Sequence, residues 1–154
     1  MYVHTSNVIK GAGATIGAGK KNSISPKGEF ETIPGGSKNK VKATGATVCA
    51  STKNEALGDF SSIGSGNNNK AEGEYSMIPG GRNNKAKRKG LIVFGHNGNA
   101  NHHNALIINI PLKSGKQTLK STSAASFTVA ANRFIFHIET TRVKITRANI
   151  GNIK

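Results

Sequence analysis

Apolar and polar positions recur in a fixed order along the chain, from residue 13 to about residue 101. Each copy of the pattern holds a Gly, a few apolar or hydroxyl residues, a turn of small residues and a cluster of Asn and Lys. The clearest copies are residues 28–41, 58–71 and 73–86, and looser copies open at Gly13, Gly45 and Gly90. A unit repeated in this way predicts a solenoid, in which each copy forms one coil stacked on the next.

The spacing of the copies predicts six coils. The openings at 13, 28, 45, 58, 73 and 90 are separated by 15, 17, 13, 15 and 17 residues, so the pattern closes on itself after 45 residues. Solenoids present long surfaces and rarely hold catalytic pockets. The organisation therefore favours a protein that presents a surface over an enzyme.

Within one coil, polar and apolar residues alternate over residues 74–78, which predicts a short strand with a buried face. The sequence Pro79-Gly80-Gly81 then ends the strand, because Pro lacks an N–H donor and Gly permits positive φ. The Asn and Lys that follow favour a polar turn, and we expect these corners to form the outer surface. The residues expected to carry the inner packing are Phe30, Ile33, Phe60, Ile63, Tyr75, Ile78, Val93 and Phe94.

The composition leaves little material for a globular core. Only 35% of the 154 residues are hydrophobic and 5% are aromatic. Disorder is one interpretation of such a chain, but the phased apolar positions favour a thin, ordered β structure. Each coil would bury too few apolar side chains to offset its ordering entropy, which predicts self-association. Cys49, the single cysteine, aligns with Phe94 of a later copy, and we expect it to be a buried apolar position.

The C-terminal third predicts further strands. Residues 106–110, 117–121, 126–130 and 133–138 read as short segments, several of them alternating with a period of two. The expected organisation is a lead-in over residues 1–12, head repeats over 13–105 and a short β-strand region over 106–154.

The repeat unit resembles that of a known family. Residues 58–71 and 73–86 share Gly, an aromatic residue, Ser, Ile, paired small residues and Asn-Asn-Lys-Ala in phase. This motif is similar to the head repeats of YadA-like trimeric adhesins and hemagglutinins, and to repeats in phage and viral tail spikes and fibres. The resemblance implies left-handed parallel β-rolls, assembled as a homotrimer around a common axis, with a role in adhesion or receptor engagement and no chemistry.

Segments that a bacterial surface adhesin would carry are missing from the sequence. The first ten residues lack the pattern of a signal peptide, and no apolar stretch is long enough to cross a membrane, so no membrane insertion is expected. No heptad stalk is present either. These features favour a virion spike, fibre or capsid-decorating protein at the virion surface over a bacterial adhesin head at the cell surface. The expected partners are identical copies and either other virion proteins or a cell-surface receptor.

The formal net charge of +15 predicts an anionic partner. The densest basic stretch supplies the candidate binding residues, with acidic glycan as a possible ligand: Arg82, Lys85, Lys87, Arg88 and Lys89. An ordinary solvated corner is the competing interpretation. Basic residues are spread along the chain without aromatic interleaving, which disfavours nucleic acid as the partner. A polyanion-binding protein, or a capsid cement protein lying on an acidic lattice, remains an alternative function.

Candidate chemistry is sparse. His96, His102 and His103 are close in sequence, but no carboxylate or thiol joins them at ligand spacing, so no metal is predicted. The Gly-rich turns lack the Lys-Ser/Thr and helix of a phosphate-binding loop.

Two pairs of carboxylates could in principle serve a glycosidase. Glu29 and Glu31, and Glu72 and Glu74, recur at matching repeat positions without an aromatic sugar platform, which favours a solvated face. The sequence therefore predicts no catalytic residue and no cofactor.

Overall fold

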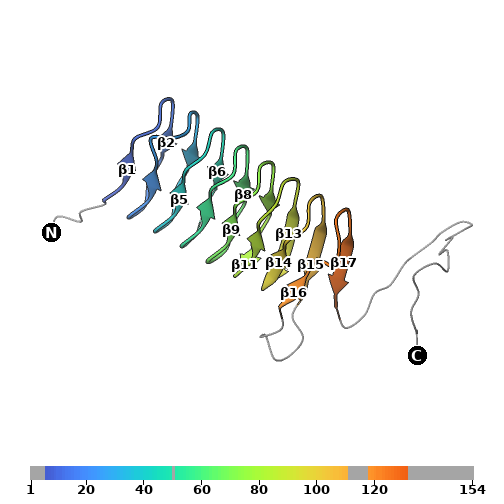
Figure 1. The fold of residues 1–154 in the computed structure, drawn as a ribbon. Helices are drawn as coiled ribbons and strands as arrows, with labels where there is room; N and C mark the ends of the chain where they lie inside the picture. Colours follow the sequence, from blue (N-terminus) through green and yellow to red (C-terminus); the bar gives the residue numbers. More distant parts are fainter. Residues whose placement is uncertain (1–5, 50, 111–117, 132–154) are drawn as a thin grey trace, which may run out of the picture.

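A computed structural model describes residues 6–49, 51–110 and 118–131. These residues form short parallel strands stacked along one axis, and no helix occurs among them. Figure 1 shows the stack, which runs from the N-terminal strands in blue to the last strand in orange. The predicted all-β solenoid is confirmed.

The strands form two sheets. Sheet 1 consists, in spatial order, of β1 (Val8–Ile9), β3 (Ser23–Ile24), β5 (Lys40–Val41), β7 (Glu55–Ala56), β9 (Lys70–Ala71), β12 (Lys85–Ala86), β14 (Gly98–Ala100) and β16 (Leu119–Lys120). Sheet 2 consists of β2 (Thr15–Ile16), β4 (Thr32–Ile33), β6 (Thr47–Val48), β8 (Ser62–Ile63), β10 (Met77–Ile78), β13 (Ile92–His96), β15 (Leu106–Asn109) and β17 (Phe127–Ala130). In addition, β11 (Gly81–Arg82) pairs with the end of β13.

Successive strands of the chain alternate between the two sheets. In one coil the chain leaves β5, turns through residues 43–46 into β6, and returns through residues 51–54 to β7. We call the first turn the aromatic corner, because the equivalent turns of other coils hold Phe30, Phe60 and Tyr75. We call the second the asparagine corner, because it holds Asn54. The parallel pairing is in register, so that Lys40, Glu55 and Lys70 lie side by side on successive strands. Equivalent residues therefore form columns along the axis, with steps of about 4.8 Å.

The structural repeat is more even than the spacing of the sequence motif. Gly45 is equivalent to Phe30 and Phe60, because all three have positive φ at the aromatic corner and donate their N–H to a carbonyl of the preceding coil. The sequence motif equates Gly45 with Gly28 and Gly58. In the structure, these two residues lie two positions before the residues that are equivalent to Gly45. Measured at the buried Asn of the asparagine corner, the coils from Asn7 to Asn84 are 15 or 17 residues long.

Small and aliphatic side chains fill the space between the sheets. One inward residue per strand is fully buried along most of the solenoid: Ile24, Val41, Ala56, Ala71, Ala86 and Ala100 from sheet 1, and Ile33, Val48, Ile63, Ile78, Val93 and Ile107 from sheet 2. Ala46, Leu91 and Ala105 close the interior at the aromatic corner. The coil is thin because each level holds only a few such side chains.

Half of the expected core residues lie inside and half lie outside. Ile33, Ile63, Ile78 and Val93 are fully buried. The others are exposed by 46 to 68%: Phe30, Phe60, Tyr75 and Phe94. The reason is a shift of one residue in the alternation, which reverses the faces of a strand. Tyr75 belongs to the turn and points outward, and the small Ser76 takes the inward place.

Cys49 is also exposed, contrary to expectation. Its alignment with Phe94 is correct, because both residues directly follow the inward residue of a sheet 2 strand. That position faces outward in both coils.

One Asn per coil is buried in the asparagine corner, where we expected an outer surface. The buried residues are Asn22, Asn39, Asn54, Asn69 and Asn84. The Oδ1 of one accepts the backbone N–H of the next at 3.0–3.1 Å. The Nδ2 of each donates to a carbonyl of the following coil. This ladder satisfies backbone groups that the sharp corner leaves outside the sheets.

Both sheets extend beyond residues 13–105. The lead-in supplies β1, which pairs with β3, and the C-terminal region supplies β15, β16 and β17. The strand expected at 133–138 lies outside the described residues.

Candidate functional site: a lysine-lined groove on sheet 1

The outward face of sheet 1 carries a basic array. Alternation along each strand places one residue inward and its two neighbours outward. Lysine is the most frequent residue type in the outward columns, which include Lys21, Lys38, Lys40, Lys42, Lys53, Lys70, Lys85, Lys87 and Lys120. The carboxylates in these columns are Glu55 and Glu72. The face is therefore strongly positive.

A shallow groove runs along the axis on this face, beside the asparagine corner. We call it the axial groove. Its first part is lined by Lys38, Lys53, Glu55, Asn68, Asn69, Lys70 and Lys85. A second hollow adjoins it at Asn68 and Lys85, which line both, and is bordered further along the axis by Asn83, Asn97, Asn99 and Thr118. Because these residues come from successive coils, the groove follows the stacking direction.

One wall of the groove is a column of residues with left-handed backbone conformation. Lys38, Lys53, Asn68, Asn83 and Asn97 have φ between 55° and 59°. The Nδ2 of Asn68 donates to Asn83 Oδ1 at 2.8 Å, and the Nδ2 of Asn83 donates to Asn97 Oδ1 at 3.2 Å. This wall therefore begins as ammonium groups and continues as a chain of hydrogen-bonded amides.

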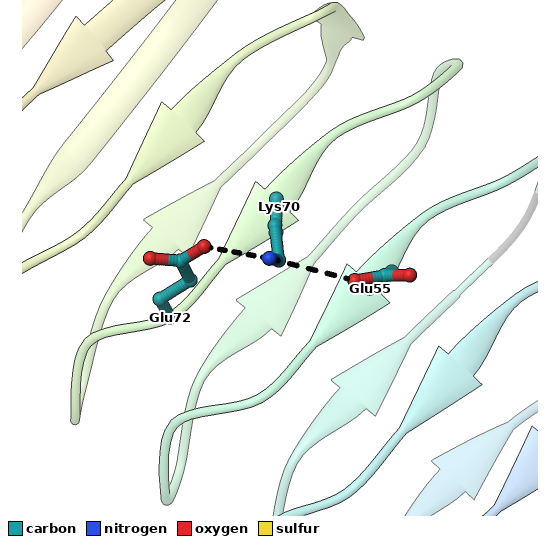
Figure 2. Close-up of polar contacts among 3 residues, drawn as sticks. All are labelled: Glu55, Lys70 and Glu72. Atoms are coloured by element: carbon teal, nitrogen blue, oxygen red, sulfur yellow. Dashed lines mark ion pairs between the residues drawn. The ribbon is translucent and has the colours of Figure 1, made fainter.

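Lys70 in the floor of the groove is held by two carboxylates. Its Nζ lies 2.8 Å from Glu72 Oε1 and 3.8 Å from Glu55 Oε2, as Figure 2 shows. The hydrogen bond to Glu72 raises the pKa of Lys70 above 10.5. No ion pair among the described residues involves Lys38, Lys53 or Lys85. Three cations of the groove are thus available to an anionic ligand, while the fourth is neutralised.

Two further lysines of this face repel one another. Lys40 and Lys42 project from the same stretch of chain, on either side of the buried Val41. Hydrogen bonding and charge repulsion from Lys40 lower the pKa of Lys42 below 10.5. An anion bound here would relieve this repulsion.

The structure separates the basic residues that are close in sequence. Lys85 and Lys87 project from sheet 1, and Lys85 lines the axial groove. Lys89 lies at the aromatic corner, where its Nζ is 3.2 Å from Glu74 and 5.3 Å from the centre of the Tyr75 ring. Arg82 faces the asparagine corner beside Thr52, Asn67 and His96. Lys87 and Arg88 line a hollow together with Glu72 and Asn101, so the five predicted binding residues are distributed over several parts of the coil.

Sequence inspection missed Lys38 and Lys53. The signal was present as the Asn that directly follows each of them and recurs every 15 or 17 residues. If that Asn is assigned to the interior, the preceding residue must face outward.

The outward face of sheet 2 has the opposite character. Its first column reads Thr15, Thr32, Thr47, Ser62, Met77, Ile92, Leu106 and Phe127. Phe94, Ile108 and Val129 continue the apolar part in a second column. None of these residues is charged. The face changes from hydroxyl groups at the N-terminal end to a continuous apolar patch at the C-terminal end, where Phe127 is 60% exposed.

In the described part of the chain no three His, Cys, Asp or Glu side chains lie together. His102 instead contacts Ser121, with Nδ1 and Oγ 2.8 Å apart. The Ser121 hydroxyl also accepts the N–H groups of Asn101 and His102, and Ser121 is 5% exposed. This arrangement ties the chain after residue 118 to the preceding coil and gives a substrate no access to the hydroxyl.

The carboxylate pairs are divided by the structure. Glu29 is exposed, whereas Glu31 is fully buried and both of its carboxylate oxygens lack a hydrogen-bond partner. Glu72 binds Lys70, and Glu74 binds Lys89. Glu31 is therefore closed to solvent, and Glu72 and Glu74 are held by different lysines.

Comparisons with family models, with curated proteins and with solved structures found no match to this chain. None of the described residues belongs to a helix that is long and apolar enough to cross a membrane. The repeat motif and the two contrasting faces are therefore what support a function.

Proposed function

We propose that this chain is a non-enzymatic β-solenoid, left-handed and homotrimeric, that serves as a virion spike, fibre head or capsid decoration in adhesion or structural attachment. The repeat motif supports the class of protein. The proposed trimer is inferred from the distribution of charge, since the outward face of sheet 1 is basic and the outward columns of sheet 2 are uncharged.

Sheet 2 is the face through which copies associate. Sheet 1 faces of two copies would repel one another through their lysines, whereas sheet 2 brings no charge to a contact. The exposed apolar side chains of Met77, Ile92, Phe94 and Phe127 form a patch of the kind that marks an interaction surface. Burying it in a trimer supplies the apolar contact area that a single thin coil lacks. Sheet 1 then faces outward.

The oligomeric state of the full chain tests this proposal. We expect sedimentation velocity and mass photometry to give a trimer for the wild type. Ile92→Lys places a charge in the neutral column, at a side chain that is 39% exposed, and should shift the protein to monomer without disturbing the interior. Leu57→Lys adds the same charge to the outward face of sheet 1 and should leave the trimer intact.

A wild-type protein that sediments as a stably folded monomer would contradict the assembly. Equal dissociation of Ile92→Lys and Leu57→Lys would contradict the assignment of the interface to sheet 2.

Attachment is tested by where the chain is found and how it binds. Immunogold electron microscopy of a culture that expresses the chain should place the label on virion surfaces. Label confined to bacterial cell surfaces would favour the alternative, a bacterial adhesin head. If adhesion is the role, the labelled trimer should bind receptor-bearing cells about a hundredfold more tightly than the Ile92→Lys monomer, because three linked sites act together.

A further inference from the structure

We propose that the axial groove of sheet 1 binds a linear sulfated polysaccharide, laid along the solenoid axis. This proposal deepens the proposed function by naming a ligand for sheet 1. It rests on that function only in assuming that sheet 1 faces outward in the assembly. The groove differs from the stretch of basic residues that the sequence singles out, because it takes Lys38, Lys53 and Lys85 from three separate coils.

The first argument is the linear arrangement of charge. Lys38 and Lys53 are equivalent positions of adjacent coils, and the N–H of Lys53 donates to the Ser37 carbonyl of the coil before it. Their ammonium groups therefore project from points about 4.8 Å apart along the axis. Lys85 lies two coils further on, across the groove. A polymer with anionic groups at regular intervals can meet all three cations, whereas a small anion meets one or two.

The second argument is that these cations have no ion-pair partner among the residues that the structure describes. Among the described residues Lys70 is neutralised by Glu55 and Glu72, and Lys89 by Glu74. Lys38, Lys53 and Lys85 have no such carboxylate. Lysines that face solvent without a carboxylate partner are available to the anionic groups of an external polymer.

The third argument favours a sulfated glycan over nucleic acid. Beyond Lys53 the wall of the groove consists of the amides of Asn68, Asn83 and Asn97, which can hydrogen-bond to sugar hydroxyl groups. Binding of single-stranded nucleic acid relies on aromatic side chains that stack on bases. The aromatic rings of Phe30, Phe60 and Tyr75 lie at the other corner of the coil, outside the groove. A duplex would be bound through its phosphates alone.

The experiment uses the full chain and heparin-derived oligosaccharides of defined length, with the dissociation constant measured by isothermal titration at several salt concentrations. The groove variant is Lys38→Asn, Lys53→Asn and Lys85→Gln. Asn is chosen because Asn68 and Asn83 already occupy this left-handed column. The matched control is Lys10→Gln, Lys20→Gln and Lys27→Gln, which removes the same charge at exposed sites outside the groove.

We expect the groove variant to lose at least about tenfold in affinity, since three charge-assisted contacts are removed, and the control to change by less than about threefold. Affinity should rise with oligosaccharide length until the ligand spans the groove. Equal losses in the two variants would show binding to net charge alone and overturn the proposal. Tighter binding to random-sequence double-stranded DNA than to the oligosaccharide, with the same loss in the groove variant, would identify nucleic acid as the ligand and also overturn it.

Sedimentation of the same samples separates the two proposals. A monomer that binds the oligosaccharide through the groove would leave the groove assignment standing and remove the trimer. A trimer without measurable binding would leave the assembly standing and overturn the groove assignment.

Discussion

The Tyr75 ring stacks on the Phe60 ring, with centroids 5.3 Å apart and planes inclined by 8°. The two residues occupy the same position in adjacent coils, and both have φ of 54°. Gly45 precedes them in this column, and a Cβ there would lie 2.7 Å from the Phe60 ring. The aromatic corner thus places a ring over a glycine and a second ring over the first. This contact stabilises an exposed corner whose backbone conformation is unfavourable for aromatic residues.

A double-mutant cycle measures the contribution of this stack. Phe60→Gly, Tyr75→Gly and the double variant remove the rings, and Gly accepts the positive φ without strain. We expect a coupling free energy of about 0.5–1.5 kcal/mol from denaturant unfolding. The pair of Phe30→Gly and Tyr75→Gly, whose rings are three coils apart, should be additive. Additivity in both cycles would show that the Phe60 and Tyr75 rings contribute independently.

The asparagine ladder should be essential for stability. Asn69→Ala removes one of the two donors to the Gly81 carbonyl, which keeps the N–H of Asn67, and leaves the buried Asn84 N–H without its acceptor. Such an unpaired group costs about 1–3 kcal/mol in the free energy of unfolding. Asn67→Ala, at an exposed position two residues earlier, should change stability by less than about 0.5 kcal/mol. Thermal and denaturant unfolding of the two variants provide the comparison, and similar losses in both would exclude a special role of the ladder.

Glu31 should be a site of stabilising substitution. Its buried carboxylate lacks a hydrogen-bond partner, and the equivalent inward position near the other end of the solenoid is Leu91. Glu31→Leu replaces a desolvated polar group by an apolar side chain of similar size, and we expect a gain of about 1–3 kcal/mol. Glu29→Gln, at the exposed neighbour, should have little effect. A loss of stability in Glu31→Leu would mean that the carboxylate binds a group inside the corner.

The lysines of sheet 1 should titrate in a defined order. The pKa of Lys42 is lowered by Lys40, and that of Lys70 is raised by Glu72, so Lys42 should lose its proton first on raising the pH. The stabilising effect of charged Lys70 is complete below 10.5 and is lost as the pH passes its raised pKa. The cost of charged Lys42 begins to fall as the pH passes its lowered pKa and is gone above 10.5, where the unfolded chain loses the proton as well. The carbon-13 shifts of the lysine Cε atoms report both midpoints.

Two variants identify the causes of these shifts. Glu72→Gln should bring the Lys70 midpoint down toward 10.5, and Lys40→Gln should bring the Lys42 midpoint up toward it. Equal midpoints for Lys42 and Lys70 in the wild type would contradict the described contacts.

The sequence by itself determined the class of fold. Phased Gly, Ile and Asn positions require stacked coils, because each coil can bury its few apolar residues only against the next. The inward places of Ile33, Ile63 and Ile78 followed from the same repetition. So did the strands over 106–109 and 127–130, although not their continuity with the two sheets.

Only the tertiary structure decided which face each remaining residue occupies. Two-residue strands are too short for alternation to fix the phase, and the positive φ of Tyr75 and Lys53 reverses the direction in which a local pattern points. Lys38, Lys53 and Lys85 are far apart in sequence and line one groove because parallel, in-register pairing sets the column of Lys38 and Lys53 beside the column that holds Lys85.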